Sequence, residues 1–163
     1  MIVIKPNDNL PEVLSSIRPY AGQFSIFLAG SIEMGNCEDW QSKIQELLKD
    51  EDVIIYNPRR EGWDSSWEQR ASNENFAHQV NWELDRLDDA DIIFMYIDPT
   101  TKSPITLLEL GLFANSDKII MCCPDGFYRK GNVEIVCKRN YIPLFNDFNE
   151  AFDYLKRTIK NSL

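Results

Sequence analysis

The stretch Ser103-Pro-Ile-Thr-Leu-Leu-Glu-Leu-Gly-Leu-Phe113 reveals more of the fold than any other. It is predicted as the start of a helix, because Ser103 can cap the first turn through its side-chain oxygen and Pro104 suits a position that needs no N–H. Apolar residues at helical spacing predict one buried face: Ile105, Leu108, Leu112 and, to one side, Phe113. Glu109 lies inside that apolar stripe. Because burying a bare carboxylate is costly, we expect Glu109 to be paired, protonated or used in chemistry.

A near-continuous apolar segment, Asp91-Ile-Ile-Phe-Met-Tyr-Ile97, precedes this helix. Such a run is typical of a parallel strand that is covered on both faces. A polar loop over residues 98–102 joins the strand to the helix. Open α/β folds keep their sites at the carboxyl ends of parallel strands, so this order of elements places Glu109 near such a site.

The remaining chain repeats the alternation of strand and helix. Further strands are expected at 24–30, 52–56, 118–123 and 141–145, and further helices at 38–49, 75–89, 133–138 and 146–160. With right-handed crossovers, this pattern predicts a single α/β domain over residues 1–163, a flavodoxin-like or Rossmann-like three-layer sandwich with a five-stranded, mainly parallel sheet. Residues 1–22 are expected to be a peripheral N-terminal extension, with a short edge strand at 1–4 and a short helix at 11–20.

Composition excludes several classes of partner. The net charge of −9 argues against a nucleic-acid polymer, since phosphate contacts need clustered Lys and Arg, although small anions such as nucleotides can still bind at local sites. The chain has no apolar run of about 18 residues, so neither a membrane span nor a membrane partner is expected. Residues 1–6 lack the features of a signal peptide. The four cysteines fit no usual zinc spacing, and we expect reduced thiols in a cytoplasmic protein.

A second carboxylate occupies a core position in the helix expected at 75–89. The apolar face of that helix is predicted to contain Phe76, Val80, Leu84 and Leu87. By helical spacing, Glu83 lies near the centre of that face. It is either a functional group or one half of an ion pair with Arg86 or with an arginine of the preceding loop. The single histidine, His78, lies off the apolar stripe and is expected in solvent.

Two loops that follow the first strands offer polar groups. Gly30 lets a ligand approach the backbone closely and Ser31 offers a hydroxyl, although a plain tight turn explains both residues equally well. The loop over 57–67 contains further candidates for substrate binding: Asn57, Arg59, Arg60 and Trp67. Tryptophan faces stack on bases, and Arg side chains bind phosphate or carboxylate. The alternative is a loop held by Trp packing, with its arginines in solvent.

Two carboxylates on apolar helix faces, both near one end of the sheet, are the usual apparatus of glycosyl transfer. One attacks the anomeric carbon, and the other handles the proton of the leaving group. Burial and mutual repulsion separate their pKa values, so that one can act in its ionised form and the other as an acid. The sequence shows no phosphate-binding glycine loop, metal cluster or dinucleotide fingerprint. We therefore expect neither a cofactor nor a metal.

Several segments together resemble the nucleoside 2-deoxyribosyltransferase family, in particular its type 2-like branch. The likeness covers roughly residues 24–135. It is carried by Phe27-Leu-Ala-Gly-Ser31, Asp39-Trp40, Asn57-Pro-Arg-Arg60, Val80-Asn-Trp-Glu83, Ala90-Asp91 and Ser103-Pro-Ile-Thr-Leu-Leu-Glu-Leu-Gly111. The resemblance implies a flavodoxin-like sandwich. It also implies transfer of a 2-deoxyribosyl group between nucleobases through a covalent glutamyl-sugar intermediate.

The resemblance also implies roles for single residues. Glu109 matches the family nucleophile, and Glu83 matches a position where family members have an Asp that works near the base. An Asp that holds sugar hydroxyls precedes the nucleophile helix in the family; here the equivalent position is Ser103, with Asp98 nearby. Gly30 and Ser31 resemble the loop that lines the base pocket.

The segment Arg129-Lys-Gly-Asn132 resembles one whose Asn is lent to the sugar 5′-hydroxyl in the neighbouring subunit. The resemblance therefore implies a homo-oligomer with shared active sites. Its small-molecule partners are expected to be a nucleoside or nucleotide and a free nucleobase.

Two other functions compete with base exchange. In a deoxynucleoside 5′-monophosphate N-glycosidase of the same fold, water attacks the sugar. The 5′-phosphate of the substrate would then need hydrogen-bond donors such as Ser31, Arg59, Arg60 or Ser103. A non-catalytic nucleotide-binding or sensor module would keep the pocket without turnover, because fold alone does not give function.

Overall fold

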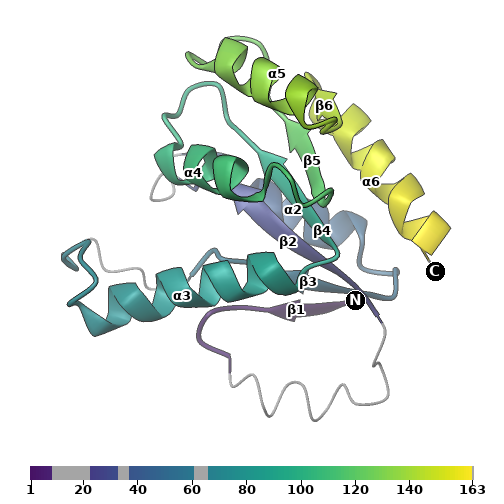
Figure 1. Ribbon diagram of the computed structural model, residues 1–163. Coiled ribbons are helices and arrows are strands. Elements are labelled where there is room, and N and C mark those ends of the chain that lie inside the picture. The colour runs from purple at the N-terminus through teal and green to yellow at the C-terminus, as the bar shows by residue number, and fades with distance from the viewer. Residues whose placement is uncertain (9–22, 33–36, 61–65, 163) are drawn as a thin grey trace.

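Six parallel strands form one sheet in the computed structural model, which describes residues 1–8, 23–32, 37–60 and 66–162 (Figure 1). The order across the sheet is β1-β3-β2-β4-β5-β6. The strands are β1 (Ile2–Ile4), β2 (Phe24–Gly30), β3 (Val53–Tyr56), β4 (Ile92–Tyr96), β5 (Ile119–Cys122) and β6 (Leu144–Phe145). The described helices are α2 (Trp40–Leu47), α3 (Glu74–Asp89), α4 (Pro104–Phe113), α5 (Lys130–Arg139) and α6 (Phe148–Ser162).

The three-layer α/β fold is as expected, but the sheet has six strands and not five. The additional strand is β1, which pairs in parallel with β3 through Ile2↔Ile54 and Ile4↔Tyr56. Residues 2–4 are therefore part of the sheet, at the edge where a short strand was expected, while the helix expected at 11–20 lies outside the described residues. At the other edge, β6 follows Pro143, which lacks the N–H that a central strand needs.

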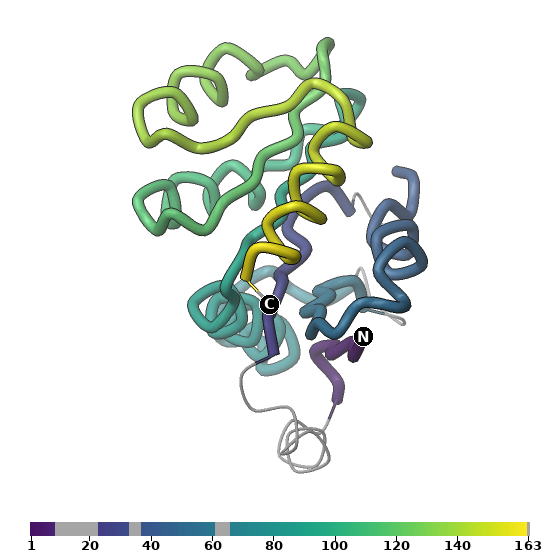
Figure 2. The backbone as a smooth tube through the Cα atoms, turned by 90° about the vertical axis from the view of Figure 1, so that its right-hand side faces the viewer, coloured from purple at the N-terminus to yellow at the C-terminus, as the bar shows by residue number. Residues whose placement is uncertain are grey.

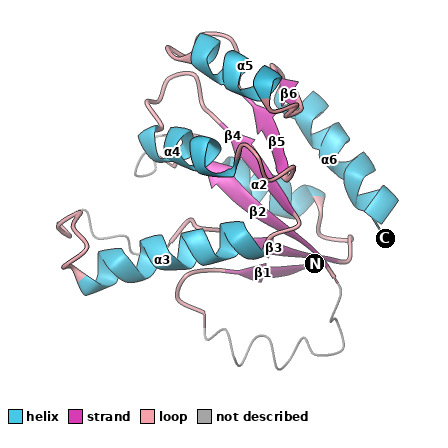
Figure 3. Ribbon diagram, in the orientation of Figure 1, coloured by secondary structure: helices cyan, strands magenta, loops and turns pink. Residues whose placement is uncertain are grey.

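Helices cover both faces of the sheet. Figures 1 and 2 show α3, α4 and α5 together on one face and α2 and α6 on the other, with the strands between them as in Figure 3. Each face has its own apolar core. On the first, Trp82, Leu87 and Leu110 pack against the sheet; on the second, Trp40 and Phe152 do. None of the described helices is long and apolar enough to cross a membrane.

The chain reverses direction across the sheet at β2. It leaves β2 for β3 by way of α2 on one face, and then passes from β3 over to β4 by way of α3 on the opposite face. The carboxyl ends of β2 and β4 lie side by side at this point, where Gly30 pairs with Tyr96. Such a switch point is where open α/β sheets hold ligands.

The predicted orientation of α4 is wrong. Ile105, Leu108 and Leu112, expected in the core, are 58%, 58% and 60% exposed, whereas Leu110 and Glu109 are buried. The helix is apolar on nearly every side, so periodicity could not identify the side that packs on the sheet. A similar error affects α3, where the predicted core residue Leu84 is exposed and Trp82 is buried.

The start of α4 also differs from expectation. Pro104 occupies the first turn as predicted, but the side chain of Ser103 makes no capping hydrogen bond. Ser103 has a left-handed backbone (φ 43°), and its hydroxyl contacts the hydroxyls of Ser31 and Thr101 instead. The loop before α4 is therefore held to the end of β2 through side chains.

Candidate active site

Glu109 lies on the side of α4 that turns toward α3, and only 7% of it is exposed. Burial, as the larger cause, and the negative charge of Glu83 together raise the pKa of its carboxyl from 4.5 to about 8. The carboxyl groups of α3 and α4 are therefore close enough to interact electrostatically. The two helices converge on the pair because both begin at the carboxyl edge of the sheet and pack on the same face.

Glu83 is partly buried on α3. Burial raises the pKa of its carboxyl, while a hydrogen bond from Gln79 lowers it. The ion pair with Arg86 that was considered from the sequence does not form. Arg86 instead bonds to Asp89, with 2.7 Å between Nη2 and Oδ2. Glu83 is thus held by an uncharged amide, which leaves its acid–base chemistry available.

Gln79 and Trp82 belong to the site but were not identified from the sequence. Gln79 is 4% exposed, and its Nε2 donates to Glu83 Oε1 at 2.7 Å and to the carbonyl oxygen of Pro58 at 3.1 Å. This amide links the loop after β3 to the carboxylate of α3. Among the described atoms, Gln79 Oε1 and Trp82 Nε1 are buried without a hydrogen-bond partner. The feature of the sequence that could have identified Gln79 is its position one helical turn before Glu83, where a polar side chain can reach the carboxylate.

Three buried hydroxyls join the end of β2 to the loop before α4. Ser31 Oγ lies 2.9 Å from Thr101 Oγ1 and 2.5 Å from Ser103 Oγ. Thr101 Oγ1 and Ser103 Oγ are 2.8 Å apart. The backbone N–H of Asp98 donates to Ser31 Oγ at 2.9 Å. Ser31, Ser103 and Asp98, three of the predicted site residues, therefore lie together. Thr101 is a member of the cluster that sequence reasoning missed.

The Asp98 carboxylate organises its own loop. Its Oδ1 accepts hydrogen bonds from the N–H of Thr100 at 2.8 Å and from the hydroxyl of Thr100 at 2.6 Å. This local turn fixes the path of the chain between β4 and α4. The Ser103 hydroxyl at the other end of this loop is buried, so Asp98 and Ser103 are held in the loop by different contacts.

Gly30 is required by the packing of the sheet end. Its φ is +150°, and a Cβ built there would lie 2.1 Å from the carbonyl oxygen of Tyr96 and 2.9 Å from the Trp40 ring. The same carbonyl accepts the N–H of Ser31 at 3.0 Å. The glycine therefore lets β2 turn tightly against β4, which positions Ser31 inside the hydroxyl cluster.

The residues of the 57–67 loop that the structure describes contact one another and α2. Asn57 is buried, and its Oδ1 accepts the N–H of Arg59 at 2.9 Å. Arg59 reaches α2, with its Nη1 3.6 Å from Asp39 Oδ1 and 3.4 Å from Gln41 Oε1. The Arg60 guanidinium lies over the Trp67 ring, 4.7 Å from its centroid. This stacking brings the predicted site residues Arg60 and Trp67 together.

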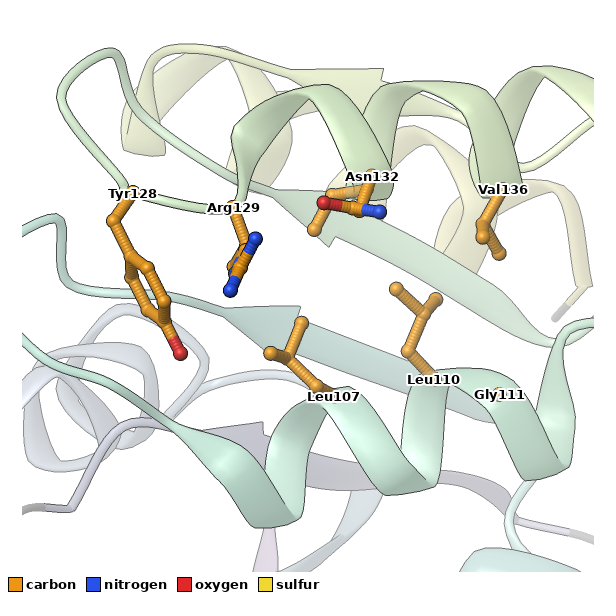
Figure 4. Close-up of a pocket in the computed structure, with 8 residues that line it drawn as sticks. Leu107, Leu110, Gly111, Tyr128, Arg129, Asn132 and Val136 are labelled. Carbon is orange, nitrogen blue, oxygen red and sulfur yellow. The ribbon is translucent and has the colours of Figure 1, made fainter.

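Asn132 lies apart from the two carboxylates within one chain. It lines a cavity of about 310 Å³ between α4 and α5, together with Leu107, Leu110, Gly111, Tyr128, Arg129, Val133 and Val136. Figure 4 shows Tyr128 and Arg129 at one end of this cavity. By the 100° turn per residue of a helix, the α4 residues that line the cavity face away from the side that carries Glu109.

The described residues contain no group of three or more His, Cys, Asp or Glu side chains that could hold a metal ion. His78, the single histidine, is exposed on α3, as expected from its position off the apolar stripe.

Comparison with known proteins links this geometry to a family. The family model described as "Nucleoside 2-deoxyribosyltransferase like" matches residues 23–127, which is more than half of the chain. The matched region begins just before β2 and extends past β5, so it contains Glu83, Glu109 and the hydroxyl cluster. No match was found among curated proteins.

Proposed function

Because the chain belongs to the nucleoside 2-deoxyribosyltransferase-like family, we propose that it transfers a 2-deoxyribosyl group between nucleobases through an ester of Glu109. The observation that carries this proposal is the buried Glu109 carboxyl with the charge of Glu83 beside it. A carboxylate in a largely dry site is a good nucleophile for a sugar carbon, because little water has to be removed before it attacks.

The proposed reaction has two displacements. A Glu109 oxygen forms a bond to C1′, the bond between C1′ and the base nitrogen breaks, and its electron pair leaves with the base. The base takes a proton, which Glu83 supplies. A second base then attacks C1′, the ester bond breaks, and Glu83 recovers a proton from the incoming base. Two inversions give retention at C1′, with ping-pong kinetics.

The raised pKa values define how the proton must move. Attack requires an ionised Glu109, whereas burial and the charge of Glu83 favour its protonated form in the empty site. Positive charge that develops on the sugar during bond cleavage favours the ionised form again. We therefore propose that substrate binding shifts the shared proton from Glu109 toward Glu83 or the base. The Gln79 amide supports this exchange by holding Glu83 in place.

Supporting groups have proposed roles around this pair. Asp98 and Ser103 lie in the loop that would meet the sugar, and Gly30 and Ser31 lie at the neighbouring end of β2. After β3, the described residues Asn57, Arg59, Arg60 and Trp67 would contact the base. Asn132 would serve the sugar of a neighbouring subunit, as the family resemblance implies.

An exchange assay tests this proposal. The protein is incubated with a 2′-deoxynucleoside and a different free base, and separately with a 2′-deoxynucleoside 5′-monophosphate. A new deoxynucleoside supports transfer. Release of free base without exchange would favour the N-glycosidase reaction, and binding without turnover in any arm would favour the sensor module.

Variants then test the nucleophile. Glu109→Ala should abolish exchange while leaving the circular dichroism spectrum unchanged, and Asp153→Asn, an exposed acid on α6, should leave exchange unaffected. Mass spectrometry of rapidly denatured wild-type enzyme should find one deoxyribosyl group on the peptide that contains Glu109. Turnover by Glu109→Ala, or an adduct on another residue, would refute the assignment.

A further inference from the structure

An open cavity of about 310 Å³ lies between α4 and α5. This volume falls at the lower end of the range that small-molecule pockets have. Its walls are formed by apolar side chains: Leu107 and Leu110 on α4, and Val133 and Val136 on α5. Figure 4 shows Leu107, Leu110 and Val136 directed into the space between the two helices. The cavity therefore offers both room and an apolar surface to a small molecule.

One end of the cavity is cationic. Arg129 is the only charged residue among the described residues that line the cavity, and its guanidinium lies 5.3 Å from the centroid of the Tyr128 ring. Figure 4 places both side chains at the same end. No carboxylate of the described residues forms an ion pair with Arg129, and the first turn of α5 contains no acidic side chain. The positive charge of Arg129 is therefore available to an anion from outside the chain.

Gly111 keeps the α4 side of the cavity open. It lies one helical turn after Leu107, and a Cβ added to it would meet no atom within 4 Å. Glycine is a poor residue for a helix, because it loses more backbone entropy on folding than alanine does. Gly111 has helical backbone angles, so neither a clash nor a left-handed conformation requires glycine here. A side chain at this position would occupy the cavity, so a ligand in the cavity accounts for the glycine.

We propose that the cavity between α4 and α5 binds a small aliphatic monocarboxylate. The Arg129 guanidinium donates two parallel hydrogen bonds to the carboxylate, which is the geometry that this side chain favours. The aliphatic chain packs along Leu107, Leu110 and Val136. One guanidinium matches one negative charge, so a carboxylate fits this cavity better than a phosphate group, which carries nearly two. An uncharged apolar molecule would leave the charge of Arg129 beside it without a partner.

This binding site is separate from the proposed active site. The residues of α4 that line the cavity face away from the side that carries Glu109. In this arrangement Asn132 makes no contact with the carboxylate, so its amide stays available for the role in the proposed function. Binding of the carboxylate needs no turnover. Its failure and the failure of deoxyribosyl transfer are therefore measured separately.

Isothermal titration calorimetry with octanoate tests the class of ligand. Octanoate has both the carboxylate and the apolar chain, acetate lacks the chain, and octylammonium has the chain with the opposite charge. The wild type should bind octanoate with a submillimolar dissociation constant. It should bind acetate and octylammonium at least about tenfold more weakly, because each lacks one of the two contacts. Failure of millimolar octanoate to saturate the protein, or equal binding of octanoate and either of the other two compounds, would overturn the proposal.

Substitutions test the location of the site. Gly111→Leu fills the cavity and should raise the dissociation constant of octanoate at least about tenfold, and Val136→Phe provides the same test from α5. Gly131→Leu is the matched control and should change little, because Gly131 is also a helical glycine with open space at its Cβ but does not line the cavity.

Arg129→Gln tests the charged end of the cavity and should abolish the preference for octanoate over octylammonium. Equal effects of Gly111→Leu and Gly131→Leu, or an unchanged preference in Arg129→Gln, would refute this site. Thermal unfolding verifies that each variant folds.

Discussion

Replacing Glu109 with Gln should stabilise the protein, and the gain should increase with pH. The unfolded chain releases the Glu109 proton near pH 4.5, whereas the folded protein releases it near pH 8. Between these values the folded state binds more protons than the unfolded state. The free energy of unfolding of the wild type therefore falls as pH rises through that window. Gln does not ionise, so the Glu109→Gln variant does not show this decrease.

The magnitude follows from the displaced pKa. Each unit of pKa difference corresponds to about 1.4 kcal/mol, so Glu109→Gln should gain about 3 kcal/mol of unfolding free energy at pH 7 and less than about 1 kcal/mol at pH 5. Urea unfolding of both proteins at pH 5, 7 and 8.5 measures the difference. The isosteric amide keeps the shape of the side chain, so packing should change little.

The exposed acid Asp153 provides the control, because Asp153→Asn should shift the unfolding free energy by no more than about 0.5 kcal/mol at any pH. A Glu109→Gln effect that is constant with pH, or a loss of stability at pH 8.5, would show that the carboxyl is not buried against an unfavourable charge. In that case the acid–base argument for the site would be wrong.

Three further perturbations test neighbouring parts of the site. Glu83→Gln removes the charge that adds to the effect of burial and should lower the pKa of Glu109; a carbon-13 NMR titration of the carboxyl measures this, and an unchanged pKa would mean that the pair is not coupled. Gln79→Ala removes the amide donor and should raise the pKa of Glu83 in the same experiment, whereas a fall would contradict the assigned hydrogen bond. Gly30→Ala should cost about 3 kcal/mol or more in urea unfolding, because the new Cβ meets the Tyr96 carbonyl, and a cost under 1 kcal/mol would refute that contact.

The sequence determined the order of elements and the position of Glu109 after a buried strand. Continuous apolar runs identified the central strands, because parallel strands covered on both faces need apolar side chains throughout. Its position among apolar residues identified Glu109 as a carboxylate that must be paired, protonated or functional. These features are local, so neighbouring residues in the chain were sufficient to find them.

Only the tertiary structure determined which side of each helix is buried. In α4 apolar residues surround the helix, so its contacts with the sheet and α5, and not its periodicity, leave Ile105, Leu108 and Leu112 exposed. The same holds for Ser103, whose hydroxyl meets Ser31, a residue distant in the chain, and for Gln79, which joins Glu83 to Pro58. Such contacts depend on where separate elements pack, and no local pattern contains that information.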